Sequence, residues 1–202
     1  HTANIMKHMF GQLYSVDETG AIVPNLAESY KISEDGKEYT FTLKSGLTCH
    51  DGEALTAEDA AYSFNRVADP EMAFTGNSAG FVYKSIDFKE ARADGERDVT
   101  IVLGGPNHIA LGLIAEVYVH CKDSYSKMSK EEAATNPVGS GPYEFVKWDK
   151  GSQIVMKKTA NPPIPTNFEN IIWRVIPEAS TRTAELIAGN VDMITNASPD
   201  QV

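Results

Sequence analysis

The chain has 202 residues, 42% of them hydrophobic, which is enough for one or two domains with a sizeable core. Its 28 acidic and 18 basic residues give a formal net charge of -10 and are scattered, which indicates an acidic, soluble globular protein and argues against a nucleic-acid-binding one. No apolar run approaches the ~20 residues that span a bilayer, and no basic start followed by an apolar stretch marks a signal peptide.

The first predicted elements are a helix and a β-hairpin. Apolar residues at three-to-four spacing predict a helix over residues 1–14. In "EYTFTLK", Tyr39, Phe41 and Leu43 alternate with polar residues, a pattern that predicts a half-buried strand. The preceding "AESYKIS" then completes a hairpin around the turn "EDG".

The segment "LTAEDAAYSFNRVADP" contains the clearest helix signal. Thr56 suits the N-cap, and Asp59 follows three residues later in a capping-box position. Asp69-Pro70 ends the helix, because the residue before a proline resists the helical region. The helix is expected to bury a stripe formed by Ala60, Phe64 and Val67.

Shorter elements are predicted between residues 71 and 136. "MAFTGNSAGF" is a glycine-rich loop that carries aromatic residues, and two strands flank the turn at Asp94-Gly95. "HIALGLIAE" predicts a short helix and "VYVHC" a strand. "SKMSKEEAATN" is polar and predicts a short helix or a loop.

The pattern changes after residue 136. Two alternating strands are joined by "DKGS", and a proline-rich surface loop, "ANPPIPTNFEN", follows them. "IIWRVIP" is continuously apolar, which predicts a buried strand. "STRTAELIAGN" predicts a helix with Ser180 or Thr181 as its cap and Gly189 as its stop, and "VDMIT" predicts another strand. Strand, helix and strand in this order indicate a right-handed βαβ unit.

The stretch "NPVGSGPYEFVKW" resembles a functional loop only superficially. A phosphate-binding loop needs Lys-Ser/Thr at the start of a helix, and here Pro142 and a strand follow the glycines. A nucleophile elbow needs Gly-x-Ser-x-Gly between a strand and a helix, whereas the order here is Gly139-Ser140-Gly141 before a strand. The motif therefore predicts a tight structural corner.

The remaining chemistry-bearing residues form no recognisable catalytic or metal site. His50-Asp51-Gly52 suits a turn better than a base or a metal ligand, and Asn196-Ala197-Ser198 matches a short glycosylation sequon. Cys49 and Cys121 form no zinc-type spacing and are either a disulfide or two free thiols. Residue chemistry predicts no enzyme, no metal site and no cofactor.

Several stretches together resemble the family 5 extracellular solute-binding proteins, the peptide, dipeptide and nickel receptors of bacterial ABC importers. The resemblance covers nearly the whole chain, in order. Its parts are "GAIVPNLAESYKISEDGKEYTFTLKSGLTCHDGEALTAEDAAYSFNRVADP", then "NPVGSGPYEF", then "IIWRVIPEASTRTAELIAGNVDMI". The chain departs from the family pattern at Cys49, at Cys121 and at "NPPIPTN", where a Trp-Gly pair is common.

The resemblance implies a mixed α/β fold. The expected architecture is a periplasmic-binding-protein-like lobe with an added α/β subdomain, without the second lobe. Residues 1–10 and 135–202 would form the core of lobe I, and residues 11–134 the added subdomain. The "GSGP" corner would lie where the chain returns from the subdomain to the core, near the ligand cleft.

The resemblance also implies a function and a ligand-binding set. The whole protein would bind an oligopeptide or dipeptide between two lobes that close over it, and deliver it to a membrane permease. It would be a periplasmic or extracellular monomer, with a lipid anchor on the full-length precursor as a further option. A solute-sensing regulator, a nickel or other-solute receptor and a secreted hydrolase remain alternatives. The residues expected near the ligand come from four places in the chain. They are the loop residues Phe74, Thr75, Gly76 and Asn77; the start of the first helix, His1–Asn4, and within it Thr2 and Asn4 above all; Ser140; and Asn196. In an exported protein, Cys49 and Cys121 are expected to pair.

Overall fold

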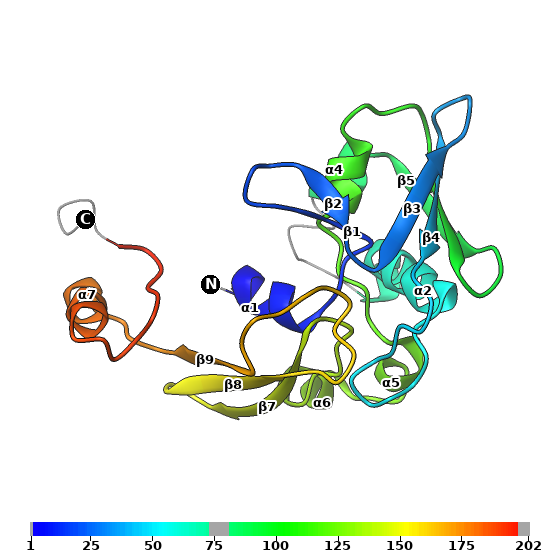
Figure 1. The fold of residues 1–202 in the computed structure, drawn as a ribbon. Coiled ribbons are helices and arrows are strands. Elements are labelled where there is room, and N and C mark those ends of the chain that lie inside the picture. The colour runs from blue at the N-terminus through cyan, green and yellow to red at the C-terminus, as the bar shows by residue number, and fades with distance from the viewer. Residues whose placement is uncertain (1, 73–80, 198–202) are drawn as a thin grey trace.

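The computed structural model describes residues 2–72 and 81–197, with the side chains of residues 2 and 3 left out. Among these residues it has a two-stranded, a four-stranded and a three-stranded sheet, all antiparallel. Figure 1 shows α1 (Thr2–Met9) between the part of the chain that holds the four-stranded sheet and the part that holds the three-stranded sheet. The helix predicted over residues 1–14 is shorter in the structure, where it covers Thr2–Met9.

The four-stranded sheet has the order β3-β4-β6-β5 and contains the strand pairs predicted around "EDG" and around Asp94-Gly95. Its strands are β3 (Ala27–Ile32), β4 (Glu38–Leu43), β5 (Phe88–Ala93) and β6 (Asp98–Leu103). Alternation in β4 buries Tyr39, Phe41 and Leu43, as predicted. The opposite face is polar, with Thr40 hydrogen-bonded to Thr100 at 2.9 Å and Arg92 ion-paired with Glu38 at 3.0 Å.

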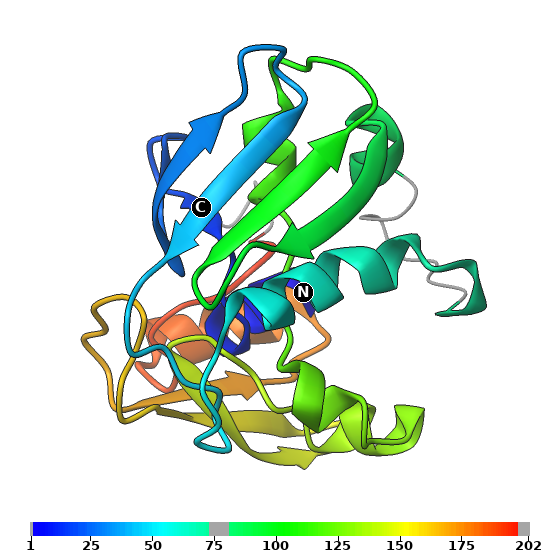
Figure 2. The ribbon, with the colours of Figure 1, turned by 90° about the vertical axis from the view of Figure 1, so that its right-hand side faces the viewer.

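Helix α2 (Ala57–Ala68) packs against β5 and β6 of this sheet, and Figure 2 shows it running across the lower end of the strands. The predicted capping box is present, and the Thr56 backbone N–H donates to the Asp59 carboxylate at 2.7 Å. Ala60 and Phe64 are fully buried, and Val67 is partly buried against the same core. Elements that complete this part of the molecule are β1 (Tyr14–Val16), β2 (Ile22–Pro24), η1 (Pro70–Met72), α3 (Tyr83–Ser85) and α4 (Ala110–Ile114).

The three-stranded sheet packs against α1 and has the order β7-β8-β9. Its strands are β7 (Tyr143–Asp149), β8 (Gln153–Lys158) and β9 (Asn170–Arg174). Met9, Phe10, Tyr143 and Met156 form a small buried cluster between α1 and this sheet. It is separate from the larger core beneath the four-stranded sheet, so the described residues enclose two hydrophobic cores.

Three further helices flank these sheets: α5 (Lys122–Tyr125), α6 (Lys130–Thr135) and α7 (Ala179–Ile187). Helix α6 occupies the polar segment for which a short helix or a loop was expected. Helix α7 follows β9, and Figure 1 shows it at the far end of that strand, away from the four-stranded sheet. Gly189, at φ +73°, ends α7 as predicted.

Two of the predicted strands are wrong. Segment 117–121 forms only an isolated bridge between Tyr118 and Gln12, because it runs across the end of α1 and not beside a strand. Segment 191–195 has no strand partner among the described residues, and Met193 is 78% exposed. The predicted βαβ unit is therefore not formed among the described residues.

Two details near the C-terminal end also differ from the prediction. Strand β9 is not buried, since Ile172 remains 56% exposed. Neither Ser180 nor Thr181 caps α7, which begins at Ala179 with Glu178 in the cap position. The Arg182 side chain instead fixes the helix start, by donating to the carbonyls of the two residues before Glu178 at 2.9 and 2.7 Å.

Candidate ligand-binding face

The corner predicted from "GSGP" lies directly against the end of α1. The Gly141 N–H donates to the Met9 carbonyl at 2.9 Å. A Cβ atom at Gly139 would lie 1.8 Å from that same carbonyl oxygen, and one at Gly141 would lie 2.7 Å from the His8 carbonyl oxygen. Both glycines are therefore required by close backbone contact, which confirms a structural corner.

Ser140 lies inside this corner and is 2% exposed. Its hydroxyl accepts from the Gly11 N–H at 3.0 Å and donates to the Val119 carbonyl at 2.8 Å. The side chain thus joins three segments that are distant in the sequence. Because both hydrogen bonds are made within the chain, Ser140 belongs to the scaffold and we remove it from the ligand-binding set.

His50 holds the corner from the other side. Its Nδ1 accepts from the Gly139 N–H at 3.2 Å, so its Nε2 carries the proton and donates to the Gly141 carbonyl at 2.9 Å. Burial lowers the pKa of His50, and the neutral ring is the form that makes both bonds. The turn expected at His50 is present, but its role as a clamp was missed because the glycines lie 89 and 91 positions away.

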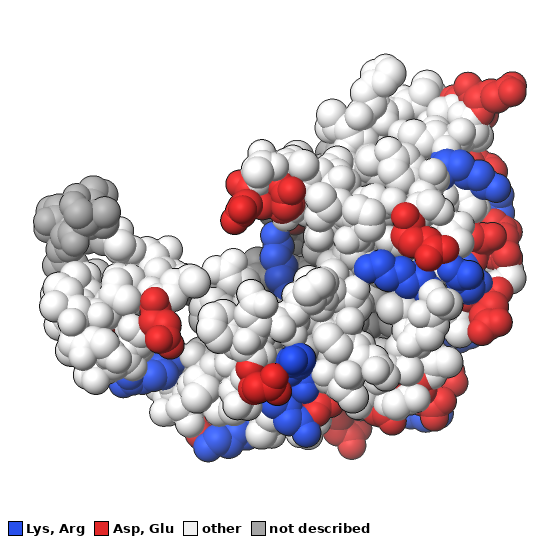
Figure 3. All heavy atoms as spheres, viewed as in Figure 1, with Lys and Arg blue, Asp and Glu red and all other residues white. Residues whose placement is uncertain are grey.

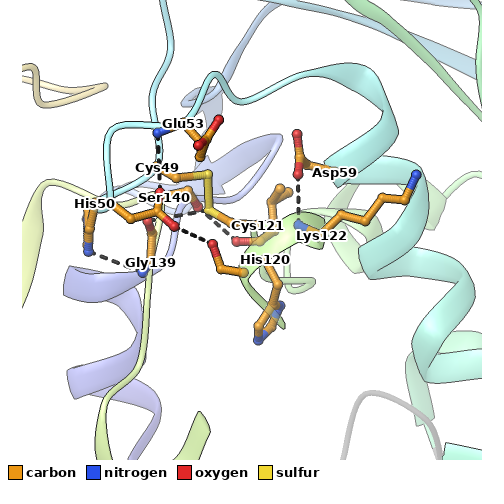
Figure 4. Close-up of a disulfide and its surroundings, with 12 residues drawn as sticks. Cys49, His50, Glu53, Asp59, His120, Cys121, Lys122, Gly139 and Ser140 are labelled. Carbon is orange, nitrogen blue, oxygen red and sulfur yellow. Dashed lines mark hydrogen bonds between the residues drawn. A yellow bond between two sulfur atoms is a disulfide. The ribbon is translucent and has the colours of Figure 1, made fainter. Parts of the chain in front are cut away.

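Cys49 and Cys121 form a disulfide beside this clamp (Figure 4). It connects the turn after β4 to the residues that precede α5, across 72 positions of sequence. Next to it, the Asp59 carboxylate accepts from the Lys122 N–H at 2.8 Å. The adjoining cavity, about 120 Å³, is too small for a peptide, since ligand pockets usually measure roughly 300–1,000 Å³.

The face that could receive a ligand is the hollow visible in Figure 3. It lies between the segment that carries α7 and the body that carries the β1–β2 hairpin. Acidic side chains gather at the hairpin edge of the hollow, and basic side chains lie directly below them. Helix α1 begins beside this hollow (Figure 1). Among residues 2–72 and 81–197, no cluster of three His, Cys, Asp or Glu side chains could hold a metal ion.

The structure describes some of the ligand residues predicted from the sequence and leaves others undescribed. Thr2 is the first residue of α1, and Asn4 is exposed in the first turn of that helix. Asn196 is exposed at φ +55°, and its carbonyl accepts from Arg182 at 3.0 Å. His1 and the loop residues Phe74, Thr75, Gly76 and Asn77 lie outside the described residues.

Comparison with known proteins identifies the family. The model of the bacterial extracellular solute-binding proteins, family 5 (middle), matches residues 21–202. The chain belongs to this family. No helix among the described residues has the length and apolarity needed to cross a membrane.

Individual relatives agree with this assignment. The chain is 31% identical to Heme-binding protein A of Haemophilus influenzae, with 86% of this chain and 35% of the relative covered. It is 28% identical to the probable di/tripeptide-binding protein 5 of Pseudomonas aeruginosa, covering 89% and 38% of the two chains. A solved structure, NikZ from Campylobacter jejuni in complex with Ni(L-His), superposes with a TM-score of 0.78 at 26% identity, covering 93% of this chain and 37% of NikZ.

These comparisons confirm the mixed α/β, periplasmic-binding-protein-like fold, and the chain spans little more than a third of the length of these relatives. Family 5 proteins bind small solutes or peptides for ABC transport systems in the periplasm or outside the cell, and they are not enzymes. One feature carries no local signal that would reveal it in the sequence, namely the His50 clamp, because its partners Gly139 and Gly141 are distant in the chain.

Proposed function

We propose that the full-length protein is the substrate-binding component of a bacterial ABC importer. It captures a small solute, an oligopeptide or dipeptide by preference, between two lobes that close over it, and delivers it to a membrane permease. The observation that carries this proposal is the family match over residues 21–202 together with a fold that presents α1 beside the hollow.

The described residues would form one wall of the binding cleft. In this proposal, residues 1–10 and 135–202 make the core of the first lobe and residues 11–134 the added subdomain. The two separate hydrophobic cores support that division, because most members of each fall on the matching side. Thr2, Asn4 and Asn196, with the loop residues 74–77, are the proposed contacts from this wall.

The chemistry shared by the relatives' ligands narrows the solute class. Haem, di- and tripeptides and L-histidine all carry at least one carboxylate, although they differ in size and metal content. A carboxylate-bearing, amino-acid-derived solute is therefore the proposed ligand. The protein is expected to work as a monomer in the periplasm or at the cell surface, where a lipid anchor would hold it near its permease.

Native mass spectrometry of the full-length protein, purified without denaturant, tests the proposal. A mass surplus that resolves into a series of short peptides is the expected result. A single discrete surplus would instead indicate one defined solute, such as a metal chelate. A protein without any surplus that also fails to bind added dipeptides and tripeptides would contradict the proposed function.

A further inference from the structure

The corner at residues 139–141 lies in a socket with three walls. The first wall is the turn at residues 49–50, the second is the segment 119–121, and the third is the end of α1 at residues 9–11. These walls come from distant parts of the sequence, and each of them hydrogen-bonds to the corner. The spacing between the walls therefore decides how tightly the corner is held.

The disulfide connects two of these walls. Cys49 belongs to the first wall and Cys121 to the second. Figure 4 shows the bond close to the corner, and the Cys121 Sγ atom lies 3.6 Å from the Gly139 carbonyl oxygen. Because the chain has two cysteines, no other disulfide within it can brace the socket.

Residues next to the two cysteines grip the corner. His50, which follows Cys49, donates its backbone N–H to the Gly139 carbonyl at 2.9 Å, in addition to the ring contacts described above. Val119 lies two positions before Cys121, and its carbonyl accepts from the hydroxyl of the corner serine at 2.8 Å. A covalent bond this close to both grips fixes the width of the socket.

The third wall connects the corner to the candidate ligand-binding face. The Gly11 N–H donates to the Ser140 hydroxyl, and the Gly11 carbonyl accepts from the Val119 N–H at 2.8 Å. The Met9 carbonyl accepts from the corner at Gly141. Helix α1 ends at Met9 and begins beside the hollow (Figure 1). A wider socket would therefore loosen the helix that borders the hollow.

The second wall is also held independently of the disulfide. The Asp59 carboxylate accepts from the Lys122 N–H at 2.8 Å. The Ser63 hydroxyl accepts from the His120 N–H at 2.7 Å. Both acceptors belong to α2, which therefore anchors this wall whether or not the disulfide is present. We expect the chain without the disulfide to fold and to hold the corner less tightly.

Forming the disulfide is a two-electron oxidation that needs an external partner. In thiol–disulfide exchange, the protein gains one S–S bond while the disulfide of the oxidant is reduced to two thiols, which take up the two protons. Oxidising compartments outside the cytosol supply such partners. Cys49 is 3% exposed and Cys121 1%, so later reduction requires the socket to open locally. The bond is therefore made once, during maturation.

We propose that the Cys49–Cys121 disulfide is a maturation lock for solute binding. Its formation closes the socket on the corner and fixes α1 beside the hollow, so that the full-length protein reaches its full affinity only after oxidation. The closure of the socket follows from the contacts above, whereas its effect on affinity rests on the proposed function.

The His50 ring reports on the socket in the folded, full-length protein. Cys49→Ala combined with Cys121→Ala removes the bond and keeps both positions small and apolar. Nuclear magnetic resonance of isotope-labelled histidine measures the tautomer and the pKa of His50. In the oxidised wild type, the proton is expected on Nε2 and the pKa below its ordinary value. In the double variant, the pKa is expected to rise toward about 6.5 and the two tautomers to mix.

Solute affinity is the second readout. Isothermal titration calorimetry measures the binding of trialanine to the oxidised wild type and to the double variant. The double variant is expected to bind roughly five- to hundredfold more weakly, the usual range for coupling between separate sites. Wild-type protein unfolded and refolded in dithiothreitol should match it, because that dithiol is oxidised to its cyclic disulfide as the protein bond is reduced.

A matched control separates the lock from general stability. Leu103→Ala removes a buried side chain of β6, at the end of the sheet away from the turn that follows β4. It is expected to lower the melting temperature and to leave the His50 tautomer and the trialanine affinity unchanged.

The contrary outcomes are distinct. A double variant with the wild-type His50 tautomer and pKa would show that hydrogen bonds alone close the socket, which overturns the inference while the proposed function stands. A released His50 with unchanged affinity would overturn the link between the socket and the hollow. A wild-type protein that binds neither trialanine nor other dipeptides and tripeptides contradicts the proposed function, and the His50 measurement still decides whether the disulfide closes the socket.

Discussion

The two regions of the molecule bury their apolar side chains to different extents. Beneath the four-stranded sheet, Phe41 and Phe64 are completely buried, and the outer face of that sheet is a ladder of polar side chains. In the β9–α7 region, Ile172 is 56% exposed, Ile187 81% and Met193 78%. The first region is therefore stabilised by its own residues, whereas the second presents apolar surface that further protein is expected to cover.

The largest expected effect comes from weakening the self-contained region. Phe64→Ala removes a fully buried ring and should lower the free energy of unfolding by about 3–5 kcal/mol. Ile172→Ala is the matched change in the other region and should cost under about 1 kcal/mol in the 202-residue chain, because much of that side chain already faces water. Urea denaturation of both variants measures the difference, and equal costs would contradict the contrast between the two regions.

The disulfide gives the next largest effect. Replacing Cys49 and Cys121 together by serine frees a loop closed across 72 positions and should cost about 2–4 kcal/mol. Reduction of the wild-type protein should lower its melting temperature to a similar extent. A double variant as stable as the oxidised wild type would show that the corner is held by its hydrogen bonds alone.

The His50 clamp gives a smaller, pH-dependent effect. Because burial lowers the pKa of His50 in the folded state, the unfolded chain binds more protons, and the stability from this group is lost as the pH falls below ~6.5. His50→Ala should cost about 1–3 kcal/mol at pH 7.5 by removing two hydrogen bonds of the corner, and should flatten the loss of stability below pH ~6.5.

The control for this prediction is His108→Ala, which changes an exposed histidine. It should leave both the stability at pH 7.5 and its pH dependence unchanged. His8 and His120 also have lowered pKa values from burial, so the His50 variant should retain part of the acid sensitivity. An unaltered pH profile in His50→Ala would show that the clamp contributes nothing.

The features predicted best are those that depend on residues close together in the sequence. The alternation in β4 and the capping box at Thr56 are local patterns, and both are present as expected. The strand expected at 191–195 failed because a strand also needs a partner, and none lies beside it among the described residues. The prediction that β9 is buried was wrong for a related reason. Ile172 is exposed because burying it requires further protein packed on the exposed face of β9.

The candidate site was predictable only in outline. Resemblance to the family pointed to the helix start and to the corner, but it could not separate Ser140, which is enclosed in the scaffold, from Asn4, which is exposed. The distinction depends on hydrogen bonds to Gly11 and Val119, far away in the sequence.

Hydrogen–deuterium exchange of the 202-residue chain and of the full-length protein tests the contrast between the two regions most directly. The account predicts that amides of β4 and β6 are equally protected in both, whereas amides of β9 and α7 gain strong protection only in the full-length protein. Equal protection of β9 and α7 in the two samples would contradict it, because the exposed apolar surface would then be a stable feature of the chain itself.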